Sequence, residues 1–209
     1  MGVIVLKATG IIVAVFITVF GQGRAPGAAE KPHAPRKLAA DFVMERSLKV
    51  LSDTITSSGK LILGGPGLLR WETTSPSKSV LVMDNSRAWI HYPDLEVTKS
   101  FDIQNDPIMK VLSEHLLALT SNDLSEISSL YRIEELPDGV KKLIPMEANV
   151  KKILAEIRVK MKNSGIASRV EMVSISGDKT TISFKNVRID PPLTPGLFSA
   201  PTSTNKNPR

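Results

Sequence analysis

The fold is decided by residues 58–94, which read SGKLILGGPGLLRWETTSPSKSVLVMDNSRAWIHYPD. Short apolar runs with a period of two are separated here by turn-forming Gly, Pro, Asn, Asp and Ser. A period of two is typical of a β-strand with one buried face, because successive side chains point to opposite sides. Closely spaced runs with tight connections predict an antiparallel meander rather than parallel strands joined by helices.

The same pattern continues on both sides of a helical segment. Strands are expected at residues 59–63, 67–73, 79–83, 87–91, 95–101, 131–135, 141–145, 154–162, 167–174 and 180–187. Residues 36–51 carry a loose apolar stripe without Gly or Pro, which predicts a first helix. Asp106 before Pro107 is a helix-start signal, and the residues up to Leu119 are so apolar that this second helix must be covered on several sides. The expected fold class is therefore α+β and mainly β, with about ten antiparallel strands covered by helices.

The first 29 residues resemble an export signal. Lys7 precedes an uncharged run from Ala8 to Phe20, and Gly27, Ala28 and Ala29 offer small residues for a signal peptidase. The run is shorter than the roughly 20 residues that a membrane-spanning helix needs. We expect residues 1–29 to be a cleaved signal peptide that directs the chain to the periplasm, with an uncleaved anchor as the alternative.

Composition narrows the class of protein further. The 209 residues include no cysteine, which excludes disulfides, thiolate metal sites and a lipid-modified cysteine. The formal charge is +6, but the basic residues are spread out and lack interleaved aromatics, so nucleic-acid binding is not expected. They form either a solvated face or a basic rim that attracts anionic lipids or an acidic partner. We expect one domain over residues 30–201 and a disordered polar tail at 202–209.

No enzyme motif stands out. His33, His91 and His115 are scattered over different expected elements, and Gly64–Gly67 lacks the lysine and following helix of a phosphate loop. We therefore expect no catalytic residue, no cofactor and no metal.

The pieces of the opening stretch match a known family in order and spacing. Consecutive strand signatures of the LolA family are resembled by Ser58-Gly59-Lys60-Leu61, Pro66 to Glu72, Pro76, Val80 to Asp84 and Trp89 to Pro93. The later part, including Gly177-Asp178-Lys179-Thr180, resembles a divergent LolA-like subgroup. The resemblance implies an incomplete antiparallel β-barrel with helical lids that shields the acyl chains of lipoproteins in transit between the inner and outer membranes. It also implies an inner-membrane release complex and an outer-membrane acceptor as partners, and we expect a monomer.

The resemblance also directs the choice of binding residues. Leu69 and Trp71 share a strand face that Arg70 does not, and Leu69 falls where the family has a groove-lining residue, although an ordinary core pair is the alternative. The predicted lipid groove comprises Leu61, Leu63, Leu69, Trp71, Val80, Val82 and Trp89. The predicted lid helix contributes Ile108, Met109, Leu112 and Leu116.

One position departs from the family. Many LolA proteins have an arginine that latches the lid immediately before the proline of the second strand motif, where this chain has Gly65. The sequence therefore leaves two interpretations of the cargo. The alternative to a lipoprotein carrier is a LolA-like module that binds a free lipid or glycolipid in a specialised export pathway or in envelope sensing.

Overall fold

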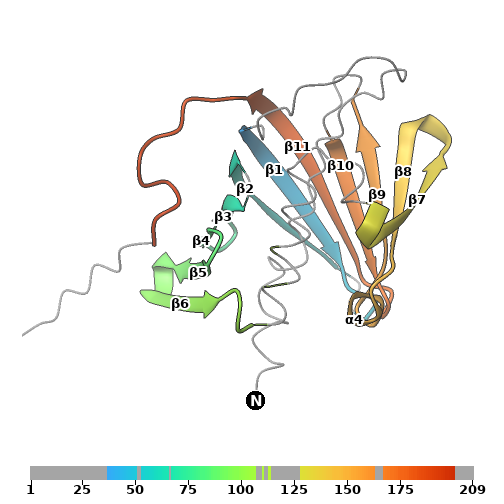
Figure 1. The fold of residues 1–209 in the computed structure, drawn as a ribbon, viewed down its shortest axis with the longest axis horizontal. Helices are drawn as coiled ribbons and strands as arrows, with labels where there is room; N and C mark the ends of the chain where they lie inside the picture. The colour runs from blue at the N-terminus through green and yellow to red at the C-terminus, as the bar shows by residue number, and fades with distance from the viewer. Residues whose placement is uncertain are drawn as a thin grey trace, which may run out of the picture.

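The computed structural model describes residues 37–50, 53–65, 67–106, 110, 113, 128–162 and 167–200. In this part of the chain, eleven strands form one antiparallel sheet (Figure 1). The strands are β1 (Leu38–Ser47), β2 (Thr54–Gly65), β3 (Leu68–Ser75), β4 (Ser79–Met83), β5 (Arg87–Tyr92), β6 (Val97–Asp102), β7 (Tyr131–Leu136), β8 (Val140–Pro145), β9 (Leu154–Met161), β10 (Ala167–Ser174) and β11 (Lys179–Ile189). Their spatial order is β6-β5-β4-β3-β2-β1-β11-β10-β9-β8-β7.

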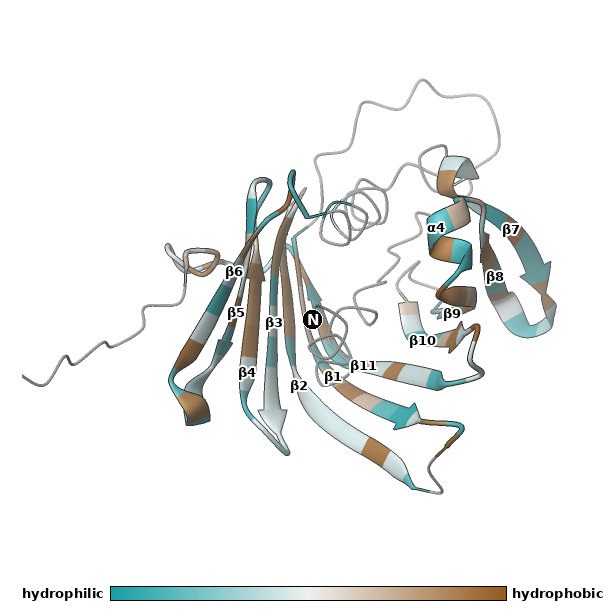
Figure 2. Ribbon diagram, turned by 90° about the horizontal axis from the view of Figure 1, so that it is seen from below, coloured by the Kyte–Doolittle hydropathy of each residue, from teal (hydrophilic) through white to brown (hydrophobic). Residues whose placement is uncertain are grey.

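The chain starts and finishes this sheet at its centre. From β1 the first six strands step outward to one edge, and the last five return from the opposite edge until β11 pairs with β1. The edge strands β6 and β7 do not pair with each other, so the sheet curves but stays open (Figure 2). The connection between β6 and β7 links the two edges. The expected fold class, mainly β and an incomplete antiparallel barrel, is confirmed.

The predicted first helix is wrong, and its place is taken by β1. Leu38, Ala40, Phe42 and Met44 are all buried, which is a period of two. This strand lies between β2 and β11 and bonds to both along its length. Two-sided pairing outweighs the helical propensity of this segment, since propensity is a weak local preference. It also raises the number of strands from about ten to eleven.

The remaining strands follow their predicted positions. β4 and β10 have the predicted bounds, and the other strands differ only at their ends. Short helical turns connect some of the strands: η1 (Pro93–Leu95) lies between β5 and β6, η2 (Pro137–Gly139) between β7 and β8, and α4 (Ala148–Lys151) between β8 and β9. Lys110 and Ser113 are helical, and the Lys110 N–H donates to the Asp106 carbonyl at 2.9 Å. Both residues fall within the segment where the second helix is predicted.

The core lies on one face of the sheet, which we call the inner face. Strands alternate buried and accessible residues, and the buried set joins residues from both halves of the sheet in one cluster. Figure 2 shows hydrophobic segments along the strands of the curved sheet. Representative members are Phe42, Leu61, Trp71, Leu81, Ile90, Ile157, Val170 and Ile182.

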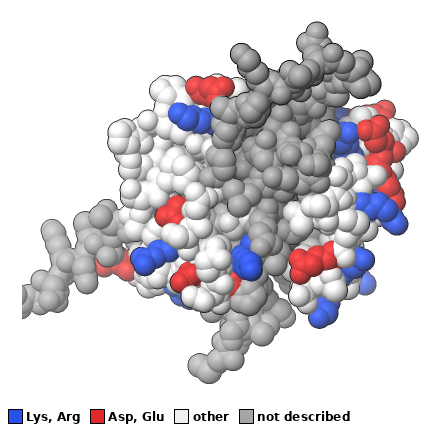
Figure 3. Space-filling model, viewed as in Figure 1, with Lys and Arg blue, Asp and Glu red and all other residues white. Residues whose placement is uncertain are grey.

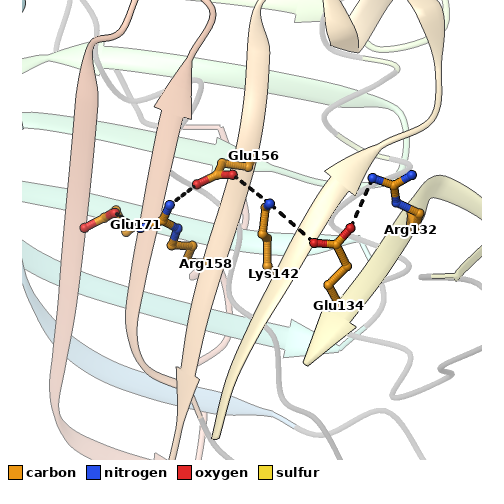
Figure 4. A network of polar contacts seen from close by, with 6 residues as sticks. All are labelled: Arg132, Glu134, Lys142, Glu156, Arg158 and Glu171. Atoms are coloured by element: carbon orange, nitrogen blue, oxygen red, sulfur yellow. Dashed lines mark ion pairs between the residues drawn. The ribbon is translucent and has the colours of Figure 1, made fainter. Parts of the chain in front are cut away.

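The opposite face, the outer face, carries charges of both signs. A chain of ion pairs crosses β7, β8, β9 and β10 from Arg132 through Glu134, Lys142, Glu156 and Arg158 to Glu171 (Figure 4). Acidic and basic side chains are interspersed over the described surface in Figure 3. None of the described helices is long and apolar enough to cross a membrane.

Candidate functional site on the inner face

Four of the predicted groove residues lie together. Leu61 and Leu63 of β2 are directly opposite Trp71 and Leu69 of β3, and each is at most 1% exposed. Directly paired residues point to the same side of a sheet, so the four side chains form one patch. Arg70, between Leu69 and Trp71, points to the outer face, as its position in the strand predicts.

The other three predicted groove residues do not share this face. Val82 is opposite both Arg70 and Trp89, and Val80 is opposite Glu72. Since Arg70 lies on the outer face, this register also places Val80, Val82 and Trp89 there. We therefore leave these three residues out of the proposed binding face.

The strands that carry them contribute different inner residues. Leu81 is opposite Trp71 and Ile90, and Met83 is opposite Leu69 and Ala88. All four added residues, Leu81, Met83, Ala88 and Ile90, are at most 2% exposed. The sequence signal for these residues is the alternation of the strands: when the register is followed from Trp71 across each hairpin, every second residue faces inward. The unbroken apolar run of β4 hides this period, and the size of Trp89 draws attention to the wrong side of β5.

An aromatic pair occupies the middle of the inner face. The rings of Phe42 and Trp71 are 4.0 Å apart between centroids and tilted by 30°. Gly59 of β2 pairs with Phe42 on one side and Thr73 on the other. A Cβ atom at Gly59 would lie 2.9 Å from Phe42 Cε1, so this glycine provides the space that the phenyl ring occupies.

Two polar atoms are buried on this face without a partner. Among the described residues, Trp71 Nε1 and Thr73 Oγ1 are the buried side-chain atoms with no hydrogen-bond partner. They belong to residues two apart in β3, so both face inward. Trp71 is fully buried and Thr73 is 8% exposed. Most buried polar groups in proteins are hydrogen-bonded, so this pair calls for an explanation.

The segment after β11 packs on the outer face. The Arg70 guanidinium donates to the Leu197 carbonyl at 3.1 Å and is paired with Glu72. The Phe198 ring covers Gly64, where a Cβ would lie 2.5 Å from Phe198 Cε2. The Leu197 carbonyl and the Phe198 ring therefore clamp this segment to the outside of the sheet.

Gly65, which replaces the family's arginine, has a backbone that disfavours substitution. Its φ is 122°, a region open to glycine and strained for residues with a Cβ. An arginine here would require a different path for the end of β2.

The predicted lid residues Ile108, Met109, Leu112 and Leu116 lie outside the described residues, as does His115.

An ion pair and a buried phenol lie on β7 and β8, at one edge of the sheet. At the β7–β8 edge, Lys141 Nζ is 2.6 Å from Glu135 Oε1, and this hydrogen bond lowers the pKa of Glu135. Burial raises the pKa of Tyr131 far above its ordinary value, so its phenol stays neutral. No group of three His, Asp or Glu residues among the described ones is arranged to hold a metal ion.

Comparison with known proteins places this geometry in a family. The chain matches the family model described as outer membrane lipoprotein carrier protein LolA over residues 35–201. It is 26% identical over 143 residues to an outer-membrane lipoprotein carrier protein of Pseudomonas paraeruginosa, across 68% of this chain and 66% of that protein. A protein of the same name from Xanthomonas oryzae pv. oryzae is 29% identical over 151 residues, with the same coverage.

The chain thus spans slightly less than two thirds of the length of these relatives. Among solved structures, a LolA superfamily protein from Nitrosomonas europaea aligns with 10% identity and a TM-score of 0.43, over 78% of this chain and 90% of that one. The resemblance drawn from residues 58–93 is confirmed by the family model. Since that model covers most of the sequence, the chain belongs to the LolA family.

Proposed function

We propose that this protein is a periplasmic carrier that holds the acyl chains of lipoproteins against its inner face and moves them from the inner to the outer membrane. The observation that carries the proposal is the inner face itself. It has buried apolar side chains on every strand from β5 across to β9 and belongs to a sheet whose edges do not close. The carrier names of the relatives support the same role.

Transfer energies explain why such a face is needed. Each CH₂ group exposed to water costs about 0.8 kcal/mol, so a lipoprotein with long acyl chains cannot cross an aqueous compartment uncovered. The proposed contact residues are Leu61, Leu63, Leu69, Trp71, Leu81, Met83, Ala88 and Ile90. The proposed cover is the predicted lid helix with Ile108, Met109, Leu112 and Leu116.

The remaining parts of the proposal concern location and partners. Residues 1–29 act as a cleaved export signal, and residues 30–201 act as one lipid-binding unit. An inner-membrane release complex loads the carrier and an outer-membrane acceptor unloads it. No catalysis is involved, because the task is to cover apolar chains and release them.

The decisive experiment is mass spectrometry of the lipids retained by protein purified from the periplasm of its own cells. Recovery of triacylated peptides supports the lipoprotein carrier. Recovery of phospholipid or glycolipid alone contradicts it and favours the module for free lipids.

Two neighbouring residues of β2 provide a matched test of the face. Leu63 is 1% exposed on the inner face, and Ile62 is half-buried on the outer face. Leu63→Thr is expected to lower the amount of retained lipid, whereas Ile62→Thr leaves it unchanged. Circular dichroism confirms that both variants fold, and equal lipid loss in the two variants would contradict the assignment of faces.

A further inference from the structure

The strand β3 changes character along the inner face. Toward one end, Leu69 is surrounded by Leu63 and Met83, which are apolar and buried. Toward the other end, Thr73 is opposite Ser79 of β4 and Gly59 of β2. The inner face therefore passes from purely aliphatic side chains to a buried region with hydroxyl groups.

Trp71 and Thr73 lie where this change occurs. Both Trp71 Nε1 and Thr73 Oγ1 are buried without a hydrogen-bond partner among the described residues. An indole N–H can only donate, and a threonine hydroxyl can donate or accept. Acceptors that enter the inner face from outside the fold would satisfy both atoms.

The neighbouring side chains define what kind of acceptor fits. The inner-face residues of β2, β3 and β4 include no lysine or arginine, so a phosphate or carboxylate would lose its hydration without a counter-charge. A neutral carbonyl oxygen carries no such penalty. Acyl chains bring this group with them, because each chain is attached to its head through an ester or amide carbonyl.

We propose that the Trp71 indole N–H and the Thr73 hydroxyl, which we call the carbonyl pair, bind the ester or amide carbonyl oxygens of acylated ligands. The inner face then selects acyl chains over plain hydrocarbon or ether-linked chains. It also orients them, with the linkage at Thr73 and the chain running past Leu69. This inference rests on the proposed lipid-binding function and adds to it a basis for recognising the ligand.

The test compares two ligands that differ only in the carbonyl group. The protein is loaded with the fluorescent hydrocarbon diphenylhexatriene, which is then displaced by dioctanoylglycerol or by its dioctyl ether. We expect the ester to displace the probe at about tenfold lower concentration, as one or two net hydrogen bonds predict. Equal displacement by ester and ether would overturn the carbonyl pair but leave lipid binding in place. Failure of the probe and both ligands to bind would contradict the proposed function, and the inference with it.

Two variants remove the polar atoms and keep the shape of the side chains. Trp71→Phe retains a ring beside Phe42, and Thr73→Val retains the branched outline of threonine. Each is expected to reduce the preference for the ester about threefold, and the double variant to abolish it, with the preference measured in each variant as the ratio of ester to ether displacement. Thr73→Ser keeps a hydroxyl and is expected to retain the preference. A preference that persists in the double variant would overturn the proposal.

Stability of the empty protein gives an independent readout. If the Thr73 hydroxyl has no partner in the fold, Thr73→Val removes an unsatisfied buried group and raises the unfolding temperature of the ligand-free protein. A lower unfolding temperature for Thr73→Val would show that the hydroxyl serves the fold, which contradicts the assignment. A stabilised variant that has lost ester selectivity supports it.

Discussion

Replacement of Gly59 by alanine is expected to destabilise the sheet at its aromatic centre. The new Cβ would fall inside the contact distance of the Glu72 carbonyl oxygen, and would lie 2.8 Å from the carbonyl carbon and 2.9 Å from Phe42 Cε1. Real Cβ atoms do not approach other atoms so closely. Two of these three contacts are with backbone, which cannot rotate away, so β2 and β3 must separate locally.

The size of the effect follows from these contacts. Overpacking of this kind costs about 1–3 kcal/mol, and disturbance of the Phe42–Trp71 ring pair adds about 0.5–1.5 kcal/mol. A total of about 3 kcal/mol lowers the unfolding temperature of a chain of this size by roughly 6–12 °C. Urea unfolding followed by far-ultraviolet circular dichroism measures the free energy of unfolding directly.

Gly64 provides a control in the same strand. A Cβ there meets the Phe198 ring at 2.5 and 2.6 Å, and a side chain at the end of a loop can swing away. Gly64→Ala is therefore expected to cost about 1 kcal/mol, a typical value for a point mutation and less than the loss expected for Gly59→Ala. Equal unfolding midpoints for Gly59→Ala and the wild type, or a larger loss for Gly64→Ala, would refute the close-approach explanation.

Three further perturbations test other contacts. Phe198→Ala is expected to free the segment after β11, so limited proteolysis should cut it faster while the sheet stays intact; an unchanged cleavage rate would contradict the clamp. Glu156→Gln removes the carboxylate that pairs with both Lys142 and Arg158 in the outer ion-pair chain. It is expected to lower the free energy of unfolding by about 1 kcal/mol in low salt and by less in 1 M NaCl, and a loss that does not depend on salt would contradict an electrostatic contribution of these pairs. The pKa of Asp178 is lowered, chiefly because the Lys49 N–H donates a hydrogen bond to its carboxylate. The ionised carboxylate therefore stabilises the fold at pH values above its ordinary pKa of 3.8, and this stabilisation is lost as the pH falls through the lowered pKa. Asp178→Asn should therefore unfold more easily than wild type at neutral pH, with a gap that closes on acidification; a constant gap would contradict the sign.

Sequence reasoning succeeded where a local pattern had one interpretation. The alternation around Trp71 and the turn residues between the runs placed most strands near their observed positions. It failed at residues 38–47, because Leu38, Phe42 and Met44 also fit a loose helical stripe. Only pairing with β2 and with β11, from the far end of the chain, decides between the two, and such pairing is not visible in a local window.

The inner face shows a similar division. That Leu61, Leu63, Leu69 and Trp71 share one face is predictable because their strands alternate clearly. Every residue of the run from Val80 to Met83 is apolar, so composition does not reveal that Val80 and Val82 lie on the face opposite to Trp71. The register opposite Arg70 and Glu72 supplies that information. The unpartnered state of Trp71 Nε1 and Thr73 Oγ1 depends on tertiary packing and has no signal in the sequence.

The pairing of β1 with β11 has a consequence for how the molecule folds. The two meanders each form from local hairpins, but the seam between them joins residues such as Phe42 and Phe184 from opposite ends of the chain. Contacts of this kind close a long loop and form slowly. Until residues 179–189 have been synthesised, β1 keeps one side unpaired in the middle of the future sheet. The chain therefore acquires its native structure only after its last strand is available, and formation of the seam is the step expected to limit the rate of folding.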